Sequence, residues 1–484
     1  MKYSIKAALL CLCVAASGQV LAKSSISDDK FRQLEENLPT PNTYRTASGA
    51  PGHQYWQQDV DYKIDITLND EKQTLSGRET LDYTNNSPDT LRYLWMQLDQ
   101  NKLATNAGAK TTRTAPEKKI TYRGLRNAIA TDAFSGGYNI TKVTGANGKT
   151  LPYVINGTMM RIDLPKALKS GDSVELNINW NYQLHEQKVL GGRSGYEYFK
   201  ADDNYLYEIA SWFPRAAAYY DVMGWQNKQF IGSGEFTLEF GDYNVSITVP
   251  ADHIVAATGV LQNPKDVLTK TQRNRLAKAK TADKPILVVT PDEALANEKS
   301  RSTKTKTWQF EAKNVRDFAF ASSRKFIWDA QGYKGGKTET MAMSYYPNEG
   351  NPLWEKYSTE SIIHTMEQYN KYTFDYPYPV SISVNGPVGG MEYPMITFNG
   401  PRPTLDKKTG EKTYSRATKY GLIGVIIHEV GHNYFPMIVN SDERQWTWMD
   451  EGLNTFLQFV AEQAWEENYP SRRGDAANIT SYMK

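Results

Sequence analysis

The N-terminal half of the chain alternates apolar and polar residues over several short stretches. Residues 60–68, 174–182 and 245–249 each place an apolar side chain at every second position. This alternation buries one face of an extended strand and leaves the other in water. It predicts half-buried antiparallel strands, and we assign residues 45–305 to one large, mostly β domain.

The second half of the chain, residues 306–484, mixes short apolar strands with helical patterns. Residues 361–372 place Ile362, Met366 and Tyr369 on one face of a predicted helix. A chain of 484 residues is too long for one hydrophobic core, so more than one domain is expected. Strands followed by helices predict a multidomain α+β protein.

The N-terminus reads as a targeting segment. Residues 1–22 place two lysines ahead of an apolar run and end on Ala22, which predicts a bacterial-type signal peptide and a periplasmic or secreted protein. The apolar run is short for a bilayer span, so no stable membrane insertion is expected; a retained anchor is the alternative. Residues 23–44 are polar and predicted to be an irregular leader. Both cysteines, Cys11 and Cys13, lie in the signal, which excludes a thiol nucleophile or Cys-ligated metal in the mature chain.

Charge gives no sign of a nucleic-acid partner. Without the signal, basic and acidic residues are equal in number. Residues 265–284 are rich in Lys and Arg but lack interleaved aromatic residues. We predict that this stretch is a solvated loop.

The sequence HEVGH at residues 428–432 carries the candidate chemistry. Four residues advance an α-helix by slightly more than one turn, so His428 and His432 project from the same face. Two such imidazoles can bind one zinc ion, and Glu429 between them can act on a water as general base. A structural pair of histidines on a helix is the alternative. We predict that the helix continues to Phe435 and that Pro436 ends it.

A catalytic zinc needs a third protein ligand. Glu451 lies at the start of a second predicted helix that can return to the first and supply it. Asp450 is predicted to orient a ligating histidine. The alternative is an acid that the helix dipole favours at the helix N-terminus. The aromatic residues around this acid are predicted to be core residues: Trp446, Trp448 and Phe456.

These motifs resemble those of the gluzincin aminopeptidases of the aminopeptidase N type, also called M1 metallopeptidases. The family signatures are HExxH-x18-E and, upstream, G-x-M-E-N. The second signature reads here Gly389-Gly390-Met391-Glu392-Tyr393, with tyrosine in place of the usual asparagine. The resemblance extends from about Tyr55 to the end of the chain.

The resemblance implies a saddle-like antiparallel β domain followed by a thermolysin-like catalytic domain that binds one Zn²⁺. Its ligands would be His428, His432 and Glu451, with Glu429 as the general base. The reaction it implies is hydrolysis of the first peptide bond of a peptide that has a free N-terminus.

Substrate-binding residues follow from the second motif. By resemblance, Glu392 binds the free α-amino group, and Gly389, Gly390 and Met391 line the path of the peptide. Glu208, which the β domain contributes, is a candidate for a second acid at the amine site. A plain turn at the glycines and a carboxylate in an ordinary strand-edge loop at Glu392 are the alternatives, and a residue without a role at the amine site is the alternative for Glu208.

The family also has an oxyanion-stabilising tyrosine and a helical C-terminal domain, and we expect both to be missing before Lys484. We therefore expect a fragment or a truncated product, with a natural short form as the alternative. Three functional alternatives stay open: a gluzincin endopeptidase, an epoxide hydrolase of the same family, and a catalytically impaired zinc- or peptide-binding protein.

Overall fold

The structure is a computed structural model that describes residues 41–112, 119–232 and 234–471. The predicted signal peptide, residues 1–22, and most of the predicted leader lie outside these ranges. The chain divides into two compact units, Met1–Trp56 with Tyr220–Gly224 and Gln57–Tyr219 with Trp225–Lys484. The sheets and helices that build the candidate site belong to the second unit.

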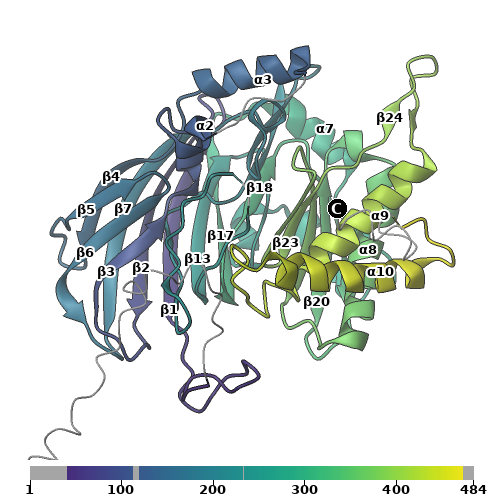
Figure 1. Cartoon of the computed structure of the whole chain (residues 1–484). Helices are drawn as coiled ribbons and strands as arrows, with labels where there is room; N and C mark the ends of the chain where they lie inside the picture. Colours follow the sequence, from purple (N-terminus) through teal and green to yellow (C-terminus); the bar gives the residue numbers. More distant parts are fainter. Residues whose placement is uncertain (1–40, 113–118, 233, 472–484) are drawn as a thin grey trace, which may run out of the picture. The chain divides into compact units, whose positions relative to one another are not determined.

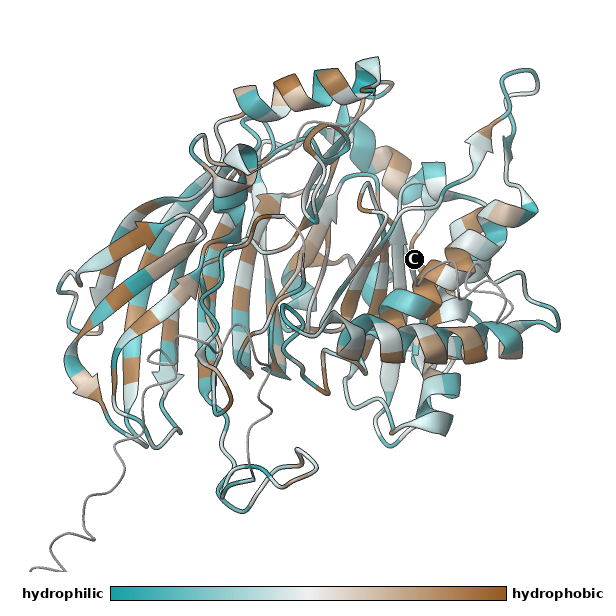
Figure 2. Ribbon diagram, viewed as in Figure 1, coloured by the Kyte–Doolittle hydropathy of each residue, from teal (hydrophilic) through white to brown (hydrophobic). Residues whose placement is uncertain are grey.

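A seven-stranded sheet is the largest element of the N-terminal half (Figure 1). Its strands, in spatial order, are β15 (Val260–Leu261), β17 (Thr305–Val315), β13 (Gly241–Pro250), β1 (Asp59–Asn69), β2 (Thr74–Thr84), β7 (Ser173–Gln183) and β4 (Asn139–Gly145). Apolar and polar residues alternate along these strands in Figure 2, which confirms the predicted half-buried strands.

One pairing in this sheet differs from the prediction. Strands β1 and β13 run parallel, with Tyr62 opposite Tyr243 and Ile66 opposite Ile247, so the expectation of antiparallel strands throughout was wrong. The alternating pattern specifies which face of a strand is buried but not its direction. The long segment between β1 and β13 acts as a crossover, which a parallel pair requires.

Two four-stranded sheets complete the β-rich part. One has the order β10 (Arg215–Ala216), β3 (Leu91–Gln97), β6 (Met159–Leu168) and β5 (Tyr153–Asn156), and the other β14 (Ile254–Ala257), β18 (Phe320–Ser323), β9 (Asn204–Ile209) and β8 (Gly195–Phe199). Short helical segments connect them: η2 (Asp99–Leu103), α2 (Gly108–Thr111), α3 (Tyr122–Ala133) and α4 (Gln187–Leu190). Strand β9 carries Glu208.

A six-stranded sheet with helices on one side forms the C-terminal half (Figure 1). Its order is β16 (Ile286–Val289), β19 (Ile327–Tyr333), β20 (Thr340–Tyr346), β21 (Val380–Asn385), β23 (Ile396–Asn399) and β22 (Gly390–Tyr393). The helical elements are η3 (Asn348–Gly350), α8 (Leu353–Tyr372), α9 (Arg416–Gly431), η4 (Trp448–Gly452) and α10 (Leu453–Trp465). The predicted α+β fold is confirmed, and β22 is the edge strand beside α9.

The two halves interleave along the sequence. Strand β16 precedes residue 306 but pairs with β19 in the six-stranded sheet. Strands β17 and β18 come almost entirely after that boundary, yet they pair with β13 and β9. The division into residues 45–305 and 306–484 stays a prediction.

The basic stretch 265–284 is helical, so its prediction as a loop was wrong. It contains most of α5 (Pro264–Val267) and all of α6 (Lys270–Ala279). A capping box of Thr269 and Gln272 starts α6. A second capping box starts the next helix, α7 (Pro291–Ser300). These caps define helix starts that a search for apolar periodicity misses, because α6 has few apolar residues.

Several buried charges in the core are paired. The Arg215 guanidinium donates to Asp99 and Asp317, and Arg316 donates to Glu443 in the chain that follows α9. A buried charge without such a partner would cost several kcal/mol, so these pairs fix the segments they join. None of the helices in the described ranges combines the length and apolar content that crossing a membrane requires.

Asp329 on β19 is a buried acid that has no cationic partner at hydrogen-bond distance among the described residues. Its carboxyl accepts hydrogen bonds from Tyr346 Oη at 2.8 Å and Thr359 Oγ1 at 2.5 Å. Burial raises the pKa of Asp329 to about 7. Its carboxyl is therefore protonated in the folded protein at a pH where the same group in the unfolded chain is ionised.

Replacing Asp329 with Asn should therefore remove a pH dependence of stability. Because the folded state binds the proton more tightly, stability is highest below the unfolded pKa and falls as pH rises towards 7. Between pH 5 and pH 7 the native protein should lose about 2 kcal/mol of unfolding free energy relative to Asp329→Asn. Urea unfolding at each pH measures this difference, and the exposed control Asp132→Asn should follow the native protein. Parallel stability curves for the native protein and Asp329→Asn would contradict the assignment.

Candidate active site

Helix α9 presents both histidines of the HEVGH sequence. Ser415 caps its start by accepting a hydrogen bond from Thr418 N at 3.1 Å. The last helical residue is Gly431, and His432 follows as the C-cap, so the helix ends earlier than predicted from Pro436. The reason is a local turn, in which His432 Nδ1 lies 3.0 Å from the carbonyl oxygen of Phe435.

Hydrogen bonds fix the tautomers of the two imidazoles. His428 Nδ1 lies 2.9 Å from Gln458 Oε1, and His432 Nδ1 is close to the Phe435 carbonyl. Because both partners are acceptors, each Nδ1 carries the proton and each Nε2 keeps its lone pair. The two Nε2 atoms lie 3.1 Å apart. At this distance both Nε2 atoms can bind one cation.

Glu451 completes a candidate metal triad. It lies in η4, and its Oε2 is 3.3 Å from His428 Nε2 and 3.8 Å from His432 Nε2. Tetrahedral coordination with bonds of about 2.0–2.2 Å separates ligand atoms by roughly 3.3–3.6 Å. The spacing and the set of two imidazoles and one carboxylate therefore fit a catalytic zinc. The predicted return of the second helix to the first is found, since α10 packs on α9.

A polar shell supports the histidines. Asp450 is fully buried, and its Oδ1 lies 2.9 Å from His432 Nδ1, which favours the orienting role over the helix-terminus alternative. Asn454 Nδ2 donates to the His428 carbonyl oxygen at 2.8 Å. Its Oδ1 accepts from the Tyr369 hydroxyl at 2.8 Å. A side chain at Gly431 would overlap both Asn454 and Tyr369, so this glycine permits the close packing of α8, α9 and α10.

Glu429 is buried beside the edge strand. A methyl group at Gly390 would lie 2.5 Å from Glu429 Oε1, whereas one at Gly389 would meet no atom within 4 Å. Burial raises the pKa of Glu429 well above its usual range, and the negative charge of Glu392 adds to this. The carboxylate therefore holds a proton readily, as a general base requires after it accepts one.

Strand β22 brings the second motif to this base. Glu392 is buried, and one of its oxygens lies within 4.8 Å of both a Glu429 oxygen and a His432 ring nitrogen. Burial raises the pKa of Glu392 to about 8. Met391 is also buried, and the buried Tyr393 packs against Phe398 with tilted rings whose centroids are 5.5 Å apart. The tyrosine that replaces the usual asparagine is therefore a core residue.

The structure adds two residues that sequence reasoning missed. A Glu235 carboxylate oxygen lies within 4.8 Å of oxygens of Glu392 and Asp450. The Arg193 guanidinium donates to both oxygens of Glu235. Neither residue belongs to a recognisable motif, because each reaches the site through a loop of the β-rich part. Only the folded structure shows that these two residues lie near the site.

Glu208 is placed close to the glycine pair. It is fully buried, and its Oε2 accepts a hydrogen bond from Val388 N at 2.8 Å, directly before Gly389. A side chain at Gly386 would overlap the Glu208 carboxyl group. Burial raises the pKa of Glu208 well above its usual range. These contacts position the loop before β22.

Beside His428 and Glu429 lies a cavity of about 740 Å³, between α9 and α10. One prediction about the surrounding residues was wrong. Trp446, Trp448 and Phe456 are exposed by 37%, 62% and 66% and are not core residues. The helix pattern could not distinguish an aromatic residue packed in a core from one facing outward.

Comparison with known proteins agrees with this geometry. Residues 354–482 match the peptidase family M1 domain. Among solved structures, the M1 zinc metallopeptidase from Deinococcus radiodurans is 15% identical over 90% of this chain and 76% of that chain, with a TM-score of 0.54. A mutant of the metallopeptidase from the same organism has been solved with a Tyr-Ser-Ala substrate. It is 14% identical over 90% of this chain and 76% of that chain, with a TM-score of 0.51. No curated protein matches the sequence.

The chain therefore carries a peptidase domain of family M1, the family that the two motifs predicted. The solved structures support the fold alone, because their sequence identity to this chain is low. The predicted enzyme class, a zinc metallopeptidase, and its cofactor, zinc, are confirmed. The roles of individual residues stay predictions.

The contact between Gly390 and Glu429 gives a matched pair of variants. In Gly390→Ala the new methyl group displaces the flexible end of Glu429, so the protein folds but the base moves. We expect kcat to fall roughly 100-fold, the cost of misplacing a catalytic group by about 1 Å. Gly389→Ala has open space and should keep kcat within about twofold of the native value. Equal kcat values for the two variants would exclude the steric link.

Asp450 gives a test of the metal site. Asp450→Asn removes the charge beside His432 and should weaken zinc binding about 10–100-fold, as loss of such supporting partners usually does. Competition with a chromophoric chelator measures the affinity. The exposed residue Asp406 provides the control, and Asp406→Asn should bind zinc as the native protein does. An unchanged affinity in Asp450→Asn would leave this carboxylate with a structural role only.

Proposed function

We propose that the protein is an aminopeptidase that hydrolyses the first peptide bond of peptides with a free N-terminus. The observation that carries this proposal is the buried Glu392 carboxylate on the edge strand, within 4.8 Å of Glu429 and His432. A carboxylate at this distance from the base can pair with an α-ammonium group and place the adjacent peptide bond at the reacting atoms. This geometry favours removal of one terminal residue over cleavage inside a chain.

The reaction uses the chain's own groups in sequence. Glu429 accepts a proton from the attacking water and later transfers it to the leaving amine. Zinc, when held by His428, His432 and Glu451, polarises the scissile carbonyl and makes the attacking water more acidic. Asp450 holds His432 in the tautomer that leaves its Nε2 lone pair free.

The substrate has a defined path in this proposal. Strand β22 is an edge strand, so its outer side offers backbone groups to a peptide lying alongside. Gly389 has open space around its Cα, and Met391 anchors the strand in the core. Glu208, which holds the loop at Val388, supports the start of this strand and is the second acid of the proposed amine site.

Two further observations support the proposal. The fold resembles that of the Deinococcus radiodurans metallopeptidase, which has been solved with a Tyr-Ser-Ala substrate and, in related structures, with single amino acids. The predicted signal peptide places this activity in the periplasm or outside the cell. We propose short peptides as the substrates there.

Glu392 provides the test. Its replacement with Gln keeps the side-chain shape and removes the charge that pairs with an α-ammonium group. For a peptide amide with a free N-terminus, kcat/KM should fall about 10–100-fold, the value of a hydrogen bond to a charged group. The N-acetylated form of the same peptide should be a poor substrate for both proteins. Equal native rates on free and acetylated peptides would show an endopeptidase instead.

Glu429→Gln is the matched control at the same site. It should lower kcat about 10²–10⁴-fold while keeping bound zinc, because it removes the base and no ligand. If Glu392→Gln behaves like Glu429→Gln, with a loss in kcat alone, then Glu392 acts in catalysis and not in substrate binding.

A further inference from the structure

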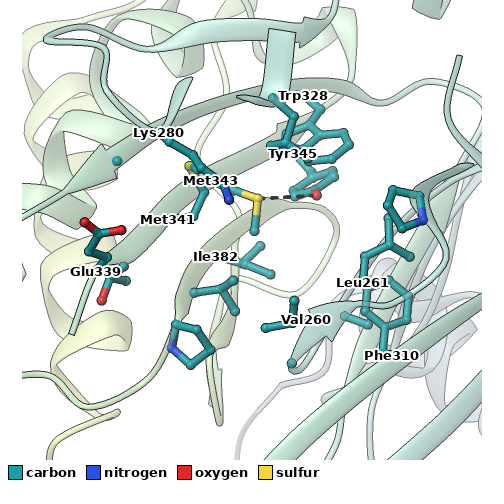
Figure 3. Close-up of a pocket in the computed structure, with 18 of the residues that line it drawn as sticks. Val260, Leu261, Lys280, Phe310, Trp328, Glu339, Met341, Met343, Tyr345 and Ile382 are labelled. Carbon is teal, nitrogen blue, oxygen red and sulfur yellow. Dashed lines mark hydrogen bonds between the residues drawn. The ribbon is translucent and has the colours of Figure 1, made fainter. Parts of the chain in front are cut away.

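A second cavity, of about 380 Å³, lies away from the zinc ligands, on the other side of the six-stranded sheet (Figure 3). Residue Ser344 of β20 faces α8, where its hydroxyl bonds those of Ser358 and Thr359. Its neighbours Met343 and Tyr345 therefore point to the opposite face and line this cavity. The far wall comes from β15, β17 and α6.

The walls are mostly apolar and include several aromatic side chains. Trp308 and Phe310 of β17 stack with nearly parallel rings, and Trp328 stacks on Tyr345 with centroids 5.0 Å apart. Both tryptophans are buried, with 1% and 2% of their surface exposed. A cavity of this size is at the lower end of small-molecule pockets, roughly 300–1,000 Å³. It suits one slender apolar group.

Residues of the lining carry hydrogen-bond donors that lack an acceptor within the described part of the chain. The indole N–H groups of Trp308 and Trp328 are buried and have no partner among the described residues. The Tyr345 hydroxyl reaches only the Met343 sulfur, at 3.9 Å, which is a weak acceptor. Buried indole N–H groups are normally paired, so a ligand that supplies oxygen acceptors would satisfy this lining.

The charged residues at the rim of the cavity also favour a ligand with oxygen acceptors. Lys280, at the end of α6, directs its amino group towards Met343 in Figure 3. Lys334 also lines the cavity, and neither lysine forms an ion pair within the described ranges. Glu339 is the one acid in the lining. The rim therefore carries a net positive charge and is matched by an anionic group.

We propose that this cavity binds an aliphatic carboxylate of medium chain length. Its chain lies against Trp308, Phe310 and Met343, and its carboxylate accepts hydrogen bonds from the unpartnered donors and pairs with Lys280. No residue of this lining belongs to the zinc site, so binding here is independent of the peptidase reaction.

Isothermal titration calorimetry of the full-length zinc protein with decanoate tests the proposal, with decan-1-ol as the uncharged probe of equal chain length. Decanoate should bind saturably, with one site per chain, and about tenfold more tightly than decan-1-ol. Absence of saturable decanoate binding overturns the proposal. Equal affinity for the two probes overturns the assignment of an anionic ligand.

Two variants and one control locate the binding. Val260→Trp fills the cavity from β15 and should abolish binding of both probes, while the thermal midpoint and peptidase turnover show that the fold is intact. Lys280→Glu should weaken decanoate about tenfold and leave decan-1-ol unchanged. Lys278→Glu, exposed on the same helix outside the lining, should bind like the native protein. Unchanged decanoate binding in both Val260→Trp and Lys280→Glu places the ligand elsewhere and overturns the proposal.

Discussion

The approach of two imidazole nitrogens to 3.1 Å is the constraint on which the candidate site depends. Both Nε2 atoms carry lone pairs, because Gln458 and the Phe435 carbonyl each accept the proton on the other ring nitrogen. The buried shell of Asp450, Asn454 and Tyr369 supports the two histidines in this arrangement. The side chains of the site are therefore held in positions that suit a metal.

Close approach between backbone and side chain organises the rest of the site. Gly390 lets the edge strand lie against Glu429, and Gly431 lets α9 lie against α8 and α10. Four acids then gather in one buried region: Glu235, Glu392, Glu429 and Asp450. Arg193 is the cation that pairs with one of them. Carboxyl groups at this place can pair with a metal cation and a substrate ammonium group, which are the two positive charges that the proposed reaction requires.

The sequence was sufficient to predict that His428, His432 and Glu451 lie together, because one helical turn aligns the two histidines and the second helix returns the acid to them. It was also sufficient for the half-buried strands of the large sheet. It failed where the outcome depends on distant packing: the parallel pairing of β1 and β13, and the exposure of Trp448 and Phe456. It also missed the local turn that ends α9 before Pro436. Arg193 and Glu235 were invisible because their positions depend on distant packing. Long-range contacts bring them to the zinc site, and no local pattern records such contacts.

The exchange of strands around residues 286–323 has a practical meaning for handling this molecule. Because β16 joins the helix-covered sheet while β17 and β18 return to the β-rich sheets, no single cut in this segment yields two complete halves. A piece starting at residue 306 would lack the edge strand β16 and expose the backbone of β19, while the remaining piece would lose most of the β17 hydrogen bonds to β13. Exposed strand edges of this kind invite self-association. Recombinant expression of the peptidase region by itself should accordingly give insoluble material, and the two halves are best regarded as one cooperative folding unit.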